Sequence, residues 1–291
     1  MSEPLPQVVR VAAERTRADD WALALAAIGI ASRIDWSPQH GYLVVVEPQD
    51  AAHAIATLGT YDDENRPRAA PVLPAEYGRS FGAVAAAVLI CGLFVITGPR
   101  AGGHPWFDAG AANAARIDAG EWWRAITALT LHADFPHVLG NTITLLLFGT
   151  ALCALVGPGV GLWLALLSGA GGNLLNTALR GAPHSAIGAS TAIFGVIGGL
   201  AAVRVMQRRR GADVSAWRAW APLGAGIALL GLLGSSERSD VLAHLFGFGV
   251  GVGLGAATAA LVPEPLRRQW QYVLAGAAAG AVGLAWRLAL R

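Results

Sequence analysis

Charged residues are scarce in this sequence. Asp, Glu, Lys and Arg make up 14% of the 291 residues, whereas 54% are hydrophobic and the mean hydropathy is +0.49. This balance excludes an ordinary soluble protein, because the surface of a soluble domain needs more polar side chains. We therefore expect an integral membrane protein.

The few charges are also unevenly distributed. The first 80 residues carry 18 of the 40 charged side chains, 7 Arg and 11 Asp or Glu, and the remaining 211 residues carry the other 22. This contrast predicts two bodies. We expect a small polar module at residues 1–61, an acidic, Pro-rich linker at residues 62–79, and a membrane body from residue 80 onward.

Cysteine is nearly absent. Cys91 and Cys153 both lie in apolar stretches, where a thiol usually packs as a small hydrophobic group. Two such residues exclude a disulfide framework and a structural zinc site, and the spans contain no other ligand cluster with metal spacing. We expect no metal and no cofactor. A net charge of only +2 also argues against a nucleic-acid partner.

Long uncharged runs predict the membrane spans, since a helix needs about 20 apolar residues to cross the hydrocarbon core. No charged residue occurs from 135 to 179, which is long enough for two helices split at the turn-forming Gly157, Pro158 and Gly159. The sequence predicts seven spans. They are residues 81–98, two helices within 135–179, and 181–203, 219–236, 241–263 and 269–286.

Arginine positions predict the orientation, because positively charged loops stay in the cytoplasm. No cleavable signal is expected, since the first 17 residues are polar. The outer loops after the third and fifth spans hold only Arg180 and Arg238. The inner loops after the fourth and sixth spans hold Arg204, Arg208, Arg209, Arg210, Arg218, Arg267 and Arg268. We expect the N-terminus inside and the C-terminus outside, although Arg287 and Arg291 then lie outside.

The first 61 residues alternate between strand-like and helix-like patterns, which is typical of a small α+β module. No catalytic constellation occurs in them. The predicted elements are strands at 8–12, 30–36 and 42–46, the last two around a turn at 37–41, and helices at 16–27 and 50–58, the second capped by Asp50.

The fourth span contains Gly188-Ala189-Ser190. A serine near the start of a helix can act as a nucleophile, because free backbone N–H groups and the helix dipole stabilise an oxyanion there. Small residues also mark simple helix crossings in membranes, so this pattern alone leaves packing open.

His244 is the only ionisable residue from Val241 to Pro263 in the sixth span. A buried ionisable group in a membrane usually faces a partner or a cavity, and histidine accepts protons near neutral pH. A structural histidine or a proton relay remains open. Ser190 and His244 both lie about 5 to 8 Å from the outer ends of their spans, a shared depth that favours a Ser-His pair. Glycines at 247, 251 and 255 predict a close approach of the sixth span to the fourth.

The second span begins with His137 and Asn141, which share one helix face because they are four residues apart. Both side chains can donate hydrogen bonds to a developing negative charge, or they can serve as polar contacts between helices. Asn173 and Asn176 of the third span are better explained as such contacts, and we assign them no role in the site.

Taken together, these residues resemble the rhomboid intramembrane serine proteases over about residues 80–262. The similarity rests on four motifs in family order: Glu121-Trp122-Trp123-Arg124, His137 to Asn141, Gly188 to Ser190, and Ala243-His244 to Gly247. It implies an all-α polytopic fold with a six-helix catalytic core at 80–262. A seventh transmembrane helix at 263–291 follows, as in six-plus-one members, and the α+β module precedes the core.

By this resemblance, Ser190 is the nucleophile and His244 the general base. His137, Asn141 and the Ser190 backbone N–H form the oxyanion hole, and Phe194 packs against the histidine. Gly188, Gly247, Trp123 and Arg124 support the site. The implied partners are transmembrane protein substrates within the lipid bilayer. The implied location is a bacterial inner membrane with the active site near the outer face.

Two features depart from the family pattern. Thr191 stands where the family often has glycine, and its bulk beside the nucleophile affects the fit of a substrate side chain. Asp240 lies four residues before His244, but the family uses a dyad, so we expect Asp240 to be an exposed loop charge rather than a third catalytic member.

Two other functional classes remain after the sequence is considered. A catalytically silent relative that binds client helices would share the fold but usually lacks the serine or the histidine, and both are present here. A small transporter or proton channel would need further ionisable groups or an inverted repeat, and neither is visible. A soluble α/β-hydrolase is excluded by the seven spans and by the missing second glycine of its nucleophile motif.

Overall fold

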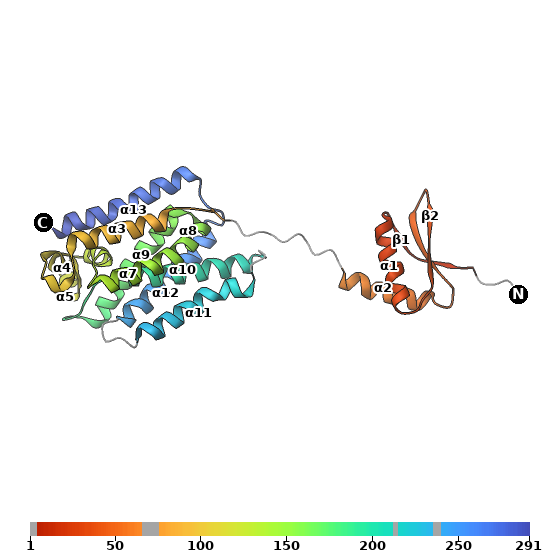
Figure 1. The fold of residues 1–291 in the computed structure, drawn as a ribbon, viewed down its shortest axis with the longest axis horizontal. Coiled ribbons are helices and arrows are strands. Elements are labelled where there is room, and N and C mark those ends of the chain that lie inside the picture. The colour runs from red at the N-terminus through yellow and green to blue at the C-terminus, as the bar shows by residue number, and fades with distance from the viewer. Residues whose placement is uncertain (1–4, 66–75, 212–214, 235–239) are drawn as a thin grey trace. The chain divides into compact units, whose positions relative to one another are not determined.

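The computed structural model describes residues 5–65, 76–211, 215–234 and 240–291 (Figure 1). The chain divides into two compact units, Met1–Ala70 and Pro71–Arg291. The first unit contains a small sheet and two helices, and the second is a helical bundle.

The first unit is an antiparallel three-stranded sheet in the order β1-β3-β2 with two helices. Its core includes Trp21, Leu25, Val44 and Leu58, which are buried between the sheet and the helices. The predicted α+β module is confirmed. The elements are β1 Gln7–Ala12, α1 Arg15–Ala27, β2 Ser32–Ser37, β3 Gly41–Val46 and α2 Ala51–Glu64.

Two details of the predicted module are wrong. Asp50 precedes α2 but makes no side-chain capping bond, because its backbone is already helical (φ −96°, ψ −10°) rather than extended as capping requires. The linker does not begin at Asp62, since α2 continues to Glu64. Asp62 instead accepts hydrogen bonds from Arg17 and Trp21, each at 2.7 Å, and from Arg10 at 3.2 Å. The rest of the predicted linker lies largely outside the described residues.

In the second unit, six helices of the described residues are long and apolar enough to cross a membrane. Five continuous helices are α3 Gly82–Thr97, α9 Pro158–Arg180, α10 Ser190–Arg209, α12 Val241–Leu261 and α13 Arg268–Ala289. The sixth is built from α7 Phe135–Thr144, a π-helical turn η3 Leu145–Gly149, and α8 Thr150–Val156. The predicted span 219–236 falls on α11 Ala216–Gly234, and its last two residues lie outside the described part.

The predicted start of the fourth span at residue 181 is wrong. Helix α10 begins at Ser190, and the preceding residues form a loop with β5 Ser185–Ala186 paired to β4 Ala112–Asn113. Gly181 and Gly188 interrupt a helix here, because their φ angles of +62° and +122° are incompatible with the right-handed helical backbone. Ser190 is therefore the first residue of α10 rather than a residue inside it.

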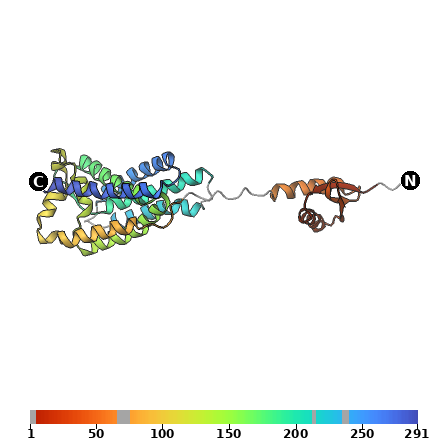
Figure 2. The same cartoon turned by 90° about the horizontal axis from the view of Figure 1, so that it is seen from above.

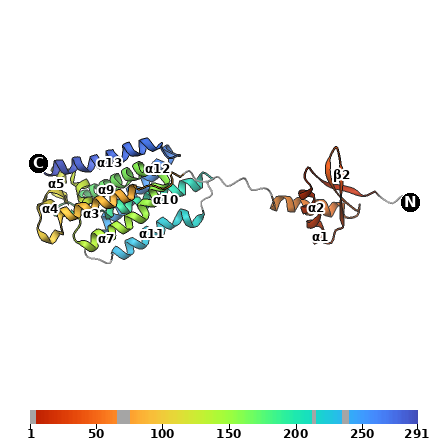
Figure 3. The ribbon, with the colours of Figure 1, turned by 45° about the horizontal axis from the view of Figure 1, so that its top comes forward.

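Glycines bring α10 and α12 together, as the sequence predicted. A Cβ added at Gly251 would lie 2.0 Å from the Gly195 carbonyl oxygen, and one added at Gly255 would lie 2.6 Å from that of Gly199. Helix α10 also packs against α9 and α11, so it is the central helix of the bundle. Figure 3 shows α13 along one side of the bundle and α11 along the opposite side, and in Figure 2 α13, in dark blue, crosses the face turned toward the viewer.

Short helices between α3 and α7 cover one end of the bundle (Figure 1). The last turn of α13 reaches this same end, where Trp286 packs against Phe107 and Leu131. The short elements are η1 Arg100–Gly102, α4 Pro105–Gly110, α5 Ala114–Asp118, α6 Arg124–Thr127 and η2 Ala128–Thr130. Together with β4 and β5 they form the surroundings of the N-terminus of α10.

Candidate active site

A cavity of about 910 Å³ opens at this end of the bundle. Ser190 and His244 line it, together with His137 and Asn141. These four residues come from α7, α10 and α12, three helices that are far apart in the sequence. The structure thus brings the predicted dyad and the two predicted oxyanion-hole side chains to one place.

Ser190 and His244 are directly hydrogen-bonded. The distance from Ser190 Oγ to His244 Nε2 is 2.7 Å. The His244 ring stacks on Phe194 with the ring centroids 4.6 Å apart and the planes 22° apart. Phe194 lies one turn after Ser190 on α10, so this single helix presents the hydroxyl and fixes the plane of the imidazole that contacts it.

His244 has no acidic third partner among the described residues, because its Nδ1 is buried without a hydrogen-bond partner there. Asp240 is not the exposed loop charge that we predicted from the sequence, since only 19% of its side chain is accessible. It caps the N-terminus of α12 by accepting a bond from the Ala243 backbone N–H. It also contacts Asn176 at 2.6 Å and His184 at 2.9 Å, which explains its burial.

His137 and Asn141 face the loop that precedes Ser190. A Cβ at Gly188 would lie 2.8 Å from His137 Nε2 and 3.7 Å from Asn141 Nδ2, so only glycine fits at this position before Ser190. His137 Nδ1 accepts a bond of 3.4 Å from the Ala133 backbone N–H, which leaves the proton on Nε2. Asn141 Nδ2 has no partner within the described residues. Both donors are available for a ligand in the cavity.

Thr191 also lines the cavity, but its methyl group is accommodated by two glycines. A Cβ at Gly172 would lie 2.6 Å from Thr191 Cγ2, and one at Gly247 would lie 3.0 Å from the same atom. The Thr191 methyl group, which adds bulk relative to the glycine often found in the family, therefore packs mostly into the crossing of α9, α10 and α12. Gly247 also passes the Thr191 carbonyl closely, which is the contact that its lack of a side chain permits.

Trp123 and Arg124 do not reach the cavity. Arg124 is only 2% exposed, pairs with Glu121, and donates to the Asp108 and Ala111 carbonyls at 2.9 and 3.1 Å. This side chain holds α4 and β4 against α6. The Trp123 ring lies edge-on to that of Trp122. Both residues act on the loop that covers the bundle end rather than on the dyad.

Of the two remaining asparagines, Asn173 donates to the Ala125 carbonyl at 3.0 Å. Asn176 binds Asp240 and His184, as described above. These contacts join α9 to α6, to the β5 loop and to α12. The predicted role of the pair as polar contacts between elements fits this geometry.

His132 is a member of the site that the sequence did not indicate. Its fully buried ring lies 5.1 Å from that of His137, and its Nε2 is 3.5 Å from the Ala189 backbone N–H. Burial, with a smaller effect of His137, lowers the pKa of His132 to about 4. The ring is therefore neutral at pH 7 and accepts this bond. The only signal in the sequence is a histidine five residues before His137.

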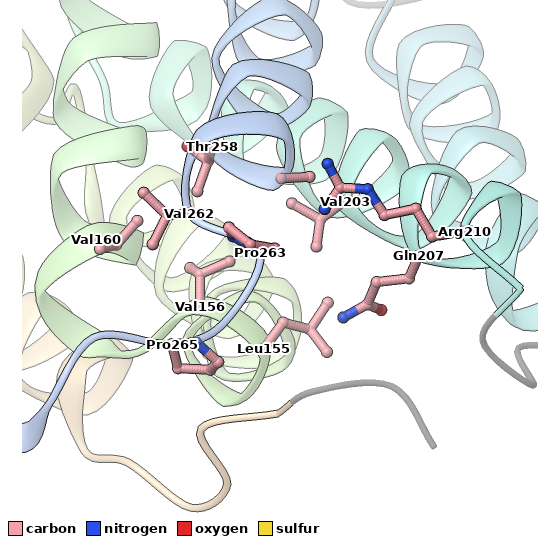
Figure 4. A pocket seen from close by; sticks show the side chains of 11 residues that line it. Leu155, Val156, Val160, Val203, Gln207, Arg210, Thr258, Val262, Pro263 and Pro265 are labelled. Atoms are coloured by element: carbon pink, nitrogen blue, oxygen red, sulfur yellow. The ribbon is translucent and has the colours of Figure 1, made fainter. Parts of the chain in front are cut away.

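A second, smaller cavity of about 30 Å³ lies far from this site (Figure 4). Its lining includes Val203 and Arg210 from the C-terminal part of α10, Val156 from α8 and Thr258 from α12. Val203 follows Ser190 by 13 residues, which corresponds to about 20 Å along a helix. This cavity belongs to the opposite end of the bundle.

Comparison with known proteins identifies a domain in the same region. Residues 119–261 match the Rhomboid domain family. The chain is 32% identical over 126 residues to the rhomboid protease GluP of Bacillus subtilis, covering 43% of this chain and 24% of that protein. It is 38% identical over 92 residues to the putative rhomboid protease YdcA of the same organism, covering 32% and 43%.

A third relative comes from a eukaryote. The chain is 39% identical over 93 residues to the rhomboid-like protease 3 of Toxoplasma gondii, covering 32% of this chain and 35% of that protein. The matches thus span less than half the length of each of these three relatives. The matched domain contains His137, Asn141, Ser190 and His244, the four residues predicted to form the dyad and the oxyanion hole. With this domain and six helices suited to cross a membrane, the chain is an integral membrane protein of the rhomboid family.

Proposed function

We propose that this protein is an intramembrane serine endopeptidase that cleaves transmembrane segments of other membrane proteins. One observation carries the proposal: Ser190 Oγ lies 2.7 Å from His244 Nε2 at the start of α10, in a cavity that His137 and Asn141 also line. A hydroxyl, a base and free donors that converge on one space are the requirements for acyl transfer.

The first half of the reaction forms an acyl-enzyme. Ser190 Oγ attacks the carbonyl carbon of the scissile peptide bond while its proton passes to His244 Nε2. The carbonyl oxygen becomes an oxyanion that His137 Nε2–H, Asn141 Nδ2–H and the Ser190 backbone N–H stabilise. The intermediate collapses when the C–N bond breaks, and His244 returns the proton to the leaving amine.

The second half releases the new carboxyl end. Water enters the cavity, gives a proton to His244 Nε2 and attacks the ester carbonyl. The same three donors stabilise the second oxyanion. Collapse of this intermediate breaks the bond to Ser190 Oγ, and His244 returns the proton to the serine.

The position of the site defines the class of substrate. Ser190 is the first residue of its helix, so the nucleophile lies near one membrane surface. Backbone carbonyls in a regular helix are engaged in hydrogen bonds and shielded from attack. The substrates are therefore membrane proteins whose spanning helices contain small or helix-weakening residues close to that surface.

The arginine distribution supports an orientation for this surface. Arg204 and Arg209 lie in the C-terminal turns of α10, and Arg268 begins α13, all at the end opposite Ser190. Since positive charge is retained in the cytoplasm, the N-terminus lies in the cytoplasm and the active site faces the outside of a bacterial inner membrane.

The test is cleavage of a reporter transmembrane segment by the purified protein in liposomes. The wild type is expected to cleave it, and Ser190→Ala and His244→Ala are expected to lose cleavage while they remain folded. Ser185→Ala is the matched control, because Ser185 lines the same cavity but the His244 ring bonds to Ser190 and to no other group among the described residues. Cleavage by folded Ser190→Ala would contradict the proposed nucleophile.

A folded wild type that binds the reporter but does not cleave it would reject the protease. That result would identify the chain instead as a silent relative that binds client helices.

A further inference from the structure

Trp286, in the last turn of α13, is tied to the loop beside the active site. Its side chain is buried, and its Nε1–H donates a hydrogen bond of 3.0 Å to Thr130 Oγ1. Thr130 Oγ1 in turn donates to the Thr127 carbonyl at 2.7 Å. The threonine hydroxyl therefore accepts one bond and donates another, which fixes its direction within the buried loop.

Apolar packing holds the same tryptophan in place. Trp286 clusters with Phe107 and Leu131, and Ile187 packs against this cluster. A Cβ at Gly110 would lie 2.5 Å from the indole ring, so the ring fills its space completely. Leu131 follows Thr130, and Ile187 is the residue directly before Gly188. The cluster that holds the indole thus contacts both sides of the junction that leads to Ser190.

The segment 128–132 then contacts two backbone N–H groups of the loop that precedes Ser190, one through a backbone carbonyl and one through a side chain. The Gly188 backbone N–H donates to the Ala128 carbonyl at 2.9 Å. The Ala189 backbone N–H faces His132 Nε2 at 3.5 Å. Thr130, the partner of Trp286, lies midway between these two contact residues. A shift of this segment would displace the two residues that immediately precede Ser190.

The other half of α13 is also held by the core. Gln271 is fully buried and accepts bonds from the Gly159 and Val160 backbone N–H groups at 2.8 and 3.1 Å. Its Nε2 donates to the Val156 carbonyl at 2.8 Å. Because α13 is fixed by polar contacts near both ends, Trp286 is presented by a rigid element rather than by a helix free to move in lipid.

We infer that Trp286 is a positioning residue for Ser190, acting from α13 through Thr130 and the segment 128–132. This inference rests on the proposed protease function for its kinetic consequence. Small displacements of a reacting group reduce turnover strongly, with losses of about 100-fold for about 1 Å. Partial release of the loop is therefore expected to reduce turnover by about tenfold.

The test compares Trp286→Phe and Thr130→Val with the full-length wild type in the same lipids. Trp286→Phe removes the Nε1–H donor, and Thr130→Val removes the hydroxyl at similar volume. We expect kcat and the rate of fluorophosphonate labelling to fall about tenfold in each variant well below its melting temperature, with KM little changed. Trp270→Phe is the matched control on α13, since Trp270 is 54% exposed, and should behave as wild type.

The double variant tests whether the two residues act through one contact. If they do, the loss in Trp286→Phe/Thr130→Val is close to that of the worse single variant rather than the product of the two. A lower melting temperature with unchanged kcat and unchanged labelling in both single variants would overturn the inference, because a purely structural role predicts that pattern. Multiplicative losses would also overturn it.

Hydrogen exchange separates this inference from the proposed function. The Gly188 and Ala189 amides should exchange about tenfold faster in Trp286→Phe than in wild type or Trp270→Phe. This ratio corresponds to a free energy of local opening that is lower by about 1.4 kcal/mol in the variant. Faster exchange in Trp286→Phe, together with a wild type that does not cleave, would reject the protease and retain the positioning. Unchanged exchange at both amides would reject the positioning whatever the activity.

Discussion

Ser190 combines two properties at one residue. Its hydroxyl contacts His244, and its backbone N–H is the first of α10, where amide groups have no acceptor within the helix. The hydroxyl is thereby paired with a base at the point where the helix stabilises negative charge. Asn141 and His137 add two side-chain donors from α7. Each of these donors makes a separable contribution that a substitution can measure.

Asn141→Ala is expected to reduce turnover by about 100- to 1000-fold while fluorophosphonate labelling remains detectable. Removal of one oxyanion donor costs roughly 3 to 4 kcal/mol in the transition state, and the other donors and the dyad still operate. Turnover and melting temperature are measured on one preparation. Thr142→Val is the control, because the Thr142 hydroxyl bonds to Val138 in its own helix. Normal turnover in a destabilised Asn141→Ala would remove Asn141 from the site.

Asp62 gives a second residue-scale test, in the N-terminal unit. Burial alone would raise its pKa, but hydrogen bonds from Trp21 and Arg10 and the charges of Arg17 and Arg10 outweigh it and hold the pKa below its ordinary value. The stabilisation is therefore present above the unfolded pKa of about 4 and is lost as the pH falls through the lower folded pKa.

Asp62→Asn should lower the free energy of unfolding of this unit by about 1 to 3 kcal/mol at pH 7. The difference from wild type should shrink as the pH falls below about 4 and through the lower folded pKa. Hydrogen exchange of the core amides of this unit in the full chain measures the free energy of unfolding of the unit. Asp19→Asn is the control, since the exposed Arg15–Asp19 pair contributes little. A difference that stays constant as the pH is lowered from about 7 to about 2 would contradict the electrostatic cause.

Residue type and spacing predicted the polar side chains that line the cavity, but not all of the residues that contact and orient them. His137, Asn141, Ser190 and His244 stand out because polar residues are rare in apolar helices. His132 and Asp240 lie in loops or at helix ends, where polar residues are ordinary and carry no signal. Their roles depend on which loops meet at the bundle end, and this long-range geometry is not contained in local sequence patterns.

At the scale of helices, the spacing of the dyad depends on how closely α10 and α12 approach. The glycines at positions 247, 251 and 255 permit backbone contact between the two helices. The sequence predicted this approach from the four-residue repeat alone. It did not predict where α10 begins, because hydropathy does not distinguish an apolar loop from an apolar helix.

Gly251→Ala is expected to destabilise the bundle by about 3 kcal/mol or more and to reduce turnover strongly. The new Cβ would lie 2.0 Å from the Gly195 carbonyl oxygen, so the helices must separate. Gly253→Ala is the matched control two residues away, where a Cβ meets nothing within 4 Å, and it should be neutral or slightly stabilising. The melting temperature and the turnover of the two variants are compared. Equal values for both variants would refute tight packing at Gly251.

At the scale of the whole molecule, the chain consists of two compact units with separate cores. Every residue of the proposed reaction lies in the second unit. The first unit has its own sheet, helices and a partly buried charged cluster around Asp62. The proposed reaction therefore uses no residue of the first unit.

A shortened chain that begins at Glu76 is therefore expected to insert, fold and cleave a reporter transmembrane segment within about threefold of the full-length rate. It retains all residues of the cavity. The measurement is turnover per folded molecule in liposomes, with the melting temperature as the control for folding. An inactive shortened chain with a normal melting temperature would show that the module takes part in the reaction.

The most direct test of the account is peptide mapping by mass spectrometry after treatment with a small fluorophosphonate. One adduct per chain is expected, on Ser190, and none in His244→Ala, because the hydroxyl is unreactive without its base. Ser185→Ala should be labelled at Ser190 like the wild type. An adduct on a different serine, or labelling of Ser190 that is equally fast without His244, would contradict the Ser190–His244 dyad.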